Sequence, residues 1–145
     1  MSIEGAIEPR SIRYRVEFVP YAQRHYLKRY AKKYGKAWDV TRIALEKQFE
    51  RIESLVLNNR TGKPIRKSAD NRYWLIKHEF AVAGTKRSPK GSGNRAIISV
   101  DRNARVVYVL MVYHKNDLGA AQRAETATWQ RLVQENCSEW LEWFD

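Results

Sequence analysis

The sequence predicts an α+β fold: a small antiparallel sheet of about four strands, an N-terminal helical hairpin packed on one face, and a C-terminal helix. Two observations support this class. Residues 106–115 open with an unbroken apolar run, rich in β-branched and aromatic residues and too short for a buried helix, which is typical of a central strand. Residues 21–57 instead repeat their apolar positions every three or four residues, as amphipathic helices do.

The composition indicates one basic domain. A chain of 145 residues suits a single hydrophobic core, so we expect one domain over 1–145. The net charge of +11 implies a polyanionic partner, such as RNA, DNA or an acidic protein. The lone Cys137 offers no intrachain disulfide or metal cluster, and we expect a packed thiol. With no signal peptide and no membrane span, we expect a cytoplasmic protein without cofactor or membrane contact.

The N-terminal half begins with a loose leader over residues 1–12. Residues 13–19 alternate between charged and apolar side chains, which predicts a half-buried strand at a sheet edge. Pro20 suits the first position of a helix that ends before Gly35. A second helix follows over 37–57, with its apolar residues on one stripe.

The C-terminal half contains the other strands. We expect strands over 72–82 and 95–101, separated by a flexible basic loop at 84–93. The second of these strands forms a hairpin with 106–115. A helix over 119–145 places Trp129 and five other aromatic or apolar residues on one stripe. We expect this stripe to dock on the sheet or on the helical hairpin. The alternative is a ridge that binds a partner.

Cations and aromatic residues gather on the predicted strands, whereas nucleotide-binding, zinc and nucleophile-elbow motifs are absent. Arginine and lysine neutralise phosphates, and tyrosine or tryptophan stacks on unpaired bases, so this combination suits RNA. The set is Arg72, Tyr73, Trp74, Lys77, His78, Arg95, Tyr113, His114 and Lys115.

Two readings of this set remain open. In the first, the protein cleaves RNA without metal. A base, such as a lysine crowded by other cations, removes the proton of a 2′-hydroxyl, which attacks its neighbouring phosphate, while cations stabilise the added negative charge and an acid protonates the leaving oxygen. His114 is a candidate acid or base in this reading, because histidine titrates near neutral pH. In the second, the cations form a solvated face that only binds RNA.

The order of these elements resembles the RelE/ParE superfamily of toxin–antitoxin toxins over Tyr14–Gln134. An R-V-E-F strand, a helical hairpin, a basic W-L-I-K strand, an N-R-A-I-I strand and a closing V-V-Y-V-L-M-V-Y-H-K strand carry the resemblance. It implies a toxin that cleaves messenger RNA on the ribosome and is neutralised by an acidic antitoxin protein. ParE-like members instead inhibit gyrase, which is the alternative function.

The resemblance also assigns residues. Arg95 matches the strand arginine that holds the scissile phosphate, and Lys115, which replaces a frequent arginine, matches the residue that stabilises the phosphate or protonates the leaving group. We expect their cationic tips to share one pocket. No tyrosine follows Lys115 closely, and Tyr113 or Trp129 could replace it. The expected catalytic residues are Arg95, Lys115, His114 and Lys77, and the expected RNA contacts are Lys63, Arg66, Lys67, Arg72, Tyr73, Tyr113, Lys86 and Arg87.

Overall fold

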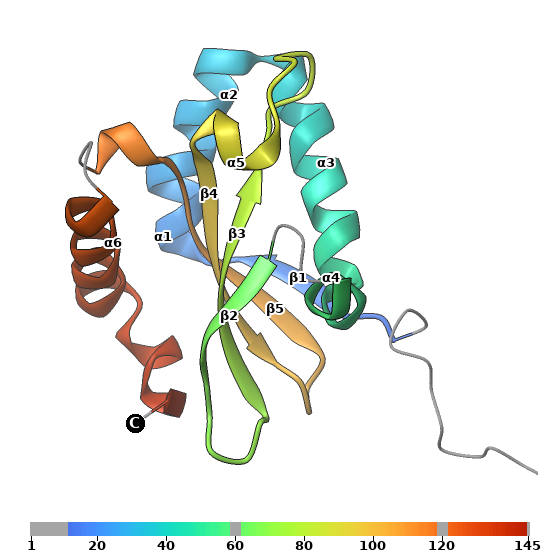
Figure 1. The fold of residues 1–145 in the computed structure, drawn as a ribbon, viewed down its shortest axis with the longest axis vertical. Coiled ribbons are helices and arrows are strands. Elements are labelled where there is room, and N and C mark those ends of the chain that lie inside the picture. The colour runs from blue at the N-terminus through green and yellow to red at the C-terminus, as the bar shows by residue number, and fades with distance from the viewer. Residues whose placement is uncertain (1–11, 59–61, 119–121, 145) are drawn as a thin grey trace, which may run out of the picture.

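A computed structural model describes residues 12–58, 62–118 and 122–144. In these ranges the chain forms a five-stranded sheet with helices on both sides (Figure 1). The predicted α+β class is therefore confirmed. The predicted leader, apart from Ile12, lies outside the described residues. No helix in the described ranges is long and apolar enough to cross a membrane.

The sheet is mixed rather than wholly antiparallel, with the strand order β1-β5-β4-β3-β2. β1 (Arg15–Phe18) forms one edge, as predicted, and runs parallel to β5 (Val106–His114). The other neighbours are antiparallel: β5 with β4 (Asn94–Asp101), β4 with β3 (Tyr73–Phe80), and β3 with β2 (Gly62–Lys67). The sequence does not reveal β2, because a proline and a bulge interrupt its alternation; both are tolerated at a sheet edge.

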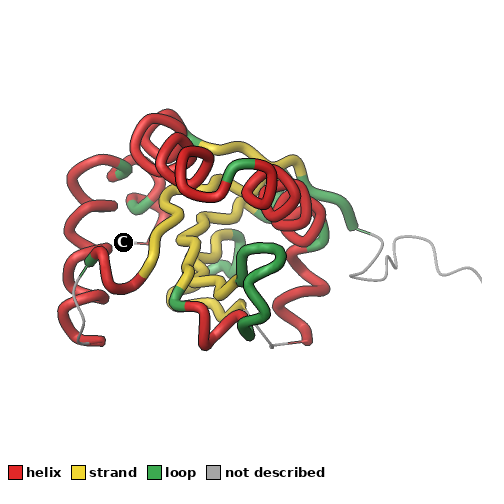
Figure 2. Tube along the Cα trace, turned by 90° about the horizontal axis from the view of Figure 1, so that it is seen from above, coloured by secondary structure: helices red, strands yellow, loops and turns green. Residues whose placement is uncertain are grey.

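The N-terminal helical hairpin covers one face of the sheet, as predicted (Figures 1 and 2). Pro20 takes the first helical position, where its missing N–H leaves no hydrogen bond unmade. Gly35 ends the first arm with a φ of 56°, and Arg51 interrupts the second arm with a φ of −115°. The arms comprise α1 (Pro20–Ala22), a π-helical turn (Gln23–Leu27), α2 (Lys28–Tyr34), α3 (Lys36–Glu50) and α4 (Ile52–Asn58).

Aromatic side chains join this hairpin to β3. The ring of Phe49 lies 5.1 Å from that of His78, and the ring of Trp38 lies 6.3 Å from that of Phe80. Successive strand residues point to opposite faces, so the odd-numbered residues of β3, including Lys77 and Glu79, face away from the hairpin.

The second face of the sheet is covered by the C-terminal segment. α6 (Gln122–Asn136) is shorter than the predicted helix over 119–145, which is wrong beyond Asn136. The chain continues in two 3-10 turns (Ser138–Trp140 and Glu142–Phe144). The aromatic residues still dock on the sheet, as expected: the ring of Trp143 stacks at 4.3 Å on that of Tyr73. Cys137 is buried, and this burial raises the pKa of its thiol to about 11, which confirms the packed thiol.

Candidate functional site

Three adjacent strands gather part of the predicted cationic set at one end of the sheet. Arg95 on β4 is registered between Glu79 on β3 and Tyr113 on β5. Because directly paired residues of antiparallel strands share a face, these three side chains and Lys77 lie on the face that α6 covers. The described structure therefore places two predicted cations and one predicted aromatic residue beneath a helix.

A short helix, α5 (Pro89–Ser92), shapes this end of the sheet and replaces part of the predicted flexible loop at 84–93. The Ser88 hydroxyl oxygen caps it by accepting a hydrogen bond from the Gly91 N–H at 3.0 Å. Gly93 ends it with a φ of 81°. A Cβ at residue 93 would lie 2.6 Å from Nε2 of His114, so only glycine fits this turn into β4.

Arg95 is sealed in the fold, with only 5% of its surface exposed. Its guanidinium forms an ion pair with Glu79 at 3.3 Å and donates hydrogen bonds to the carbonyls of Asn94 (2.9 Å) and Lys90 (3.2 Å). The expected open pocket shared by the tips of Arg95 and Lys115 is therefore wrong for this arrangement of the chain. The physical reason is the counter-charge of Glu79 together with the carbonyl oxygens of β4 and α5 that accept hydrogen bonds from the guanidinium.

Lys77 and Tyr113 meet a single carboxylate from α6. The Lys77 ammonium nitrogen lies 3.0 Å from Oε2 of Glu125, and the Tyr113 hydroxyl donates a hydrogen bond to the same oxygen at 2.7 Å. Burial, followed by this hydrogen bond, raises the pKa of Tyr113 far above its ordinary value. Tyr113 is 2% exposed, so its expected role as a stacking surface for RNA is wrong in this arrangement.

His114 and Lys115 lie where β5 ends. His114 is held on both sides of its ring: Nε2 lies 3.0 Å from the Ser92 carbonyl oxygen, and Nδ1 accepts a hydrogen bond from the Asn116 N–H. These contacts make His114 part of the turn. Lys115 is half-buried, and its backbone N–H donates to the Gly93 carbonyl at 2.8 Å. It therefore stands at the same sheet end as Arg95.

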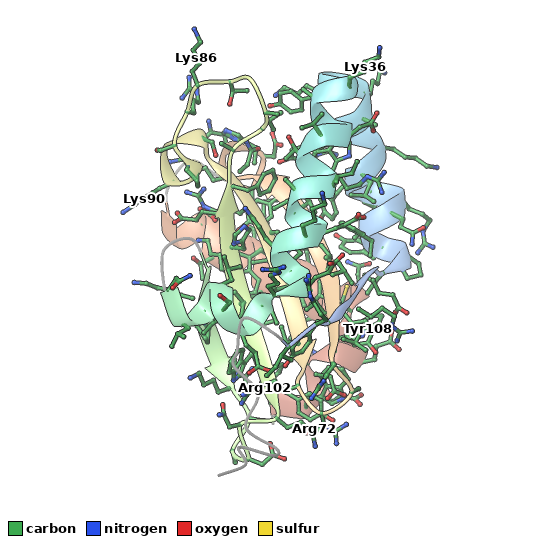
Figure 3. All side chains as sticks on the ribbon, turned by 90° about the vertical axis from the view of Figure 1, so that its right-hand side faces the viewer. Lys36, Arg72, Lys86, Lys90, Arg102 and Tyr108 are labelled. Carbon is green, nitrogen blue, oxygen red and sulfur yellow. The ribbon has the colours of Figure 1, made fainter. Side chains whose placement is uncertain are left out.

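The remaining predicted RNA contacts divide between two ends of the molecule. Lys86 and Arg87 are exposed beside α5, and Figure 3 shows Lys86 and Lys90 projecting from that end. Arg72 lies at the opposite end (Figure 3), where its guanidinium forms two hydrogen bonds to Asp101 at 3.0 and 3.1 Å. Its charge is thus neutralised, and the neighbouring ring of Tyr73 is already stacked on Trp143. Neither residue is free to receive RNA in this arrangement.

β2 carries the other three predicted contacts along the sheet edge. Lys63 is exposed and registered opposite Lys77. The guanidinium of Arg66 lies 5.5 Å from the ring of Phe144, and the ammonium of Lys67 lies 5.4 Å from that of Trp74. All three residues are exposed to solvent, and Arg66 also donates a hydrogen bond to the Phe144 carbonyl at 2.9 Å.

Sequence reasoning missed the two carboxylates that neutralise the site. Glu79 reaches Arg95 because β3 pairs with β4, and the sequence does not display this pairing. Glu125 left a signal: it precedes Trp129 and Val133 at intervals of four residues, which places it on the buried face of α6. Within the described residues, no group of three or more histidine, cysteine or acidic side chains could hold a metal ion.

The sequence matches no protein-family profile and no curated protein. Among solved structures, the chain is similar to the archaeal RelE–RelB complex from Pyrococcus horikoshii OT3. The two are 16% identical, with a TM-score of 0.46 over 74% of this chain and 98% of the other. Similarity at this level does not establish family membership.

Proposed function

We propose that this protein is a toxin-like endoribonuclease that cleaves messenger RNA without a metal ion, on the ribosome. The observation that carries the proposal is the meeting of Lys77, Arg95 and Tyr113 on three adjacent strands, with Lys115 at the same sheet end. Ammonium, guanidinium and phenol groups are the donors that a phosphodiester needs. The motif resemblance to RelE-like toxins supports the same function.

The chemistry assigned to this site is a transfer within the RNA strand. The 2′-hydroxyl gives up its proton to solvent water as its oxygen forms a bond to the adjacent phosphorus and the bond from phosphorus to the 5′-oxygen breaks, giving a 2′,3′-cyclic phosphate and a 5′-hydroxyl. Arg95 and Lys77 stabilise the negative charge on the phosphoryl oxygens, and Lys115 donates the proton that the leaving 5′-oxygen takes up. His114 positions this turn through its two ring nitrogens.

The net charge supports two partners for this function. A surface of +11 attracts ribosomal and messenger RNA over long range, and the attraction weakens as salt rises. The same surface fits an acidic antitoxin protein, whose carboxylates would compete with RNA for the exposed lysines and arginines.

Induction of the protein in a bacterial host tests the proposal. Wild type should arrest growth and produce new 5′ ends in translated messages, mapped by primer extension. Arg95→Ala and Lys115→Ala should abolish both effects, whereas Lys36→Ala removes an exposed cation from the helical hairpin and should retain them (Figure 3). Unchanged cleavage in the first two variants would reject the assignment.

A second candidate is a module that binds RNA without cleaving it. The sealed position of Arg95 favours this function, because the described cations that are open to solvent, such as Lys63 and Lys86, lie on the outer surface. In that case induction should leave messages intact, while purified protein should bind RNA with an affinity that falls steeply with salt.

A further inference from the structure

α6 rests on the sheet through few buried side chains. Among its described residues, those that are buried are Glu125, Trp129 and Val133, with exposures of 4%, 3% and 0%. One of these is charged, and the indole N–H of another, Trp129, is buried without a hydrogen-bond partner among the described residues. Such a contact face stabilises a helix less than a wholly apolar one does.

A pocket separates the same helix from the edge of the sheet. It has a volume of about 310 Å³ and lies between α6, the following turn and strands β2 and β3. Leu75 and Ile65 line it from the sheet, and Trp129, Val133 and Leu141 line it from the C-terminal segment. Close packing is therefore incomplete beneath α6, which lowers the free energy needed to lift the helix.

Glu125, the charged group that α6 buries among its described residues, occupies a position that another anion could take. Oε2 of Glu125 receives both the Lys77 ammonium at 3.0 Å and the Tyr113 hydroxyl at 2.7 Å. A phosphate oxygen would seek the same two donors at similar distances. A carboxylate and a phosphate cannot occupy this position together.

We propose that Glu125 is an internal competitor of the RNA phosphate, and that α6 is a latch that RNA displaces to reach Lys77 and Tyr113. This inference rests on the proposed function, because it assumes that RNA is the ligand of these donors. The exposed cations beside α5 make the first contact with RNA, and the phosphate then exchanges with the carboxylate. Only molecules with an open latch bind the phosphate. The apparent association constant for RNA is therefore the intrinsic constant multiplied by the fraction of open molecules.

Glu125→Gln tests the latch with little change of shape. The amide still accepts the Tyr113 hydrogen bond but no longer neutralises Lys77, so the open state should become more populated. Glu135→Gln is the matched control, because Glu135 lies on the same helix, is exposed, pairs with Arg131, and its substitution changes the net charge equally. Fluorescence anisotropy with a short single-stranded RNA should show binding about tenfold tighter for Glu125→Gln than for Glu135→Gln.

Hydrogen exchange of the wild-type protein tests the latch independently. Amides of α6 should exchange faster when the RNA is bound than in the free protein, since the helix leaves the sheet. Equal RNA affinity for both variants, together with unchanged protection of α6, overturns the latch and leaves the proposed function standing. If wild type and both variants all fail to bind RNA, the proposed function falls and the latch falls with it.

Discussion

Lowering the pH should destabilise this protein through one buried histidine. His78 on β3 is 1% exposed, packs edge-on against Phe49, and has no hydrogen-bond partner for either ring nitrogen among the described residues. Desolvation lowers the pKa of this ring from 6.5 to about 4. The folded protein therefore holds His78 neutral at a pH where the unfolded chain binds a proton.

The size and sign of the effect follow from these two pKa values. Above pH 6.5 the ring is neutral in both states, so the contribution of His78 to stability does not vary with pH. As the pH falls from 6.5 toward 4, only the unfolded state gains a proton, and the free energy of unfolding decreases. The difference between the two pKa values corresponds to about 3 kcal/mol in the free energy of unfolding. About 2 kcal/mol of this should be lost between pH 7 and pH 5.

Urea denaturation at pH 7 and pH 5 measures this loss. His78→Leu replaces the ring with an apolar side chain of similar size, so the variant should lose about 2 kcal/mol less than wild type over the same interval. At pH 7 it should be no less stable than wild type, because two buried unpaired nitrogens are removed. His25→Leu is the control, since His25 is exposed on the helical hairpin and should leave the loss unchanged. An equal loss in wild type and His78→Leu would refute the assignment.

Three further outcomes test the fold around the site. Gly93→Ala should lower the free energy of unfolding by about 1 kcal/mol more than Gly84→Ala does. Both glycines have a positive φ, but only at residue 93 does an added Cβ meet His114. Urea denaturation compares the two variants, and equal losses of stability would contradict the steric argument. Cys137, with its pKa raised to about 11 by burial, should react with a thiol reagent at pH 8 only after unfolding, and prompt labelling of the native protein would contradict its burial. Trp143→Ala removes a ring stacked on the sheet at 4.3 Å and should cost about 1 kcal/mol or more in thermal denaturation, whereas an unchanged Tm would show that the tail does not stabilise the fold.

Local patterns were sufficient for most elements of the fold. The strands at 73–80, 94–101 and 106–114 and the two helical arms are marked by apolar runs or by apolar periodicity within a few residues of chain, and such patterns report burial directly. Strand partners are set by contacts between distant segments, so the parallel pairing of β1 with β5 was not predictable in this way. The end of α6 was missed for a different reason: Trp140 and Trp143 cover the same sheet face as the helix, so they continue its stripe after the helix has ended.

The sequence predicted the cations of the site but not the carboxylates that pair with them. Arg95 and Lys77 stand on strands that the sequence reveals, but their approach to one sheet end depends on the pairing of β3 with β4, which the sequence does not display. Their exposure depends on which carboxylates reach them. Glu79 reaches Arg95 through strand register and Glu125 reaches Lys77 through the docking of α6, and both are tertiary facts that charge counting along the chain cannot supply.

The two partly buried ion pairs at this end of the sheet are more than stability requires. Apolar residues of similar volume would hold α6 on the sheet at least as well, because removing two charges from water offsets most of their mutual attraction. The pairs of Arg95 with Glu79 and of Lys77 with Glu125 do keep both cations oriented toward one place, while the exposed Lys86 and other outer cations remain available to draw in a polyanion. Under the proposed function, exposure separates two tasks, long-range attraction by the outer cations and short-range contact by the inner ones, and contact with Lys77 requires that α6 can be lifted.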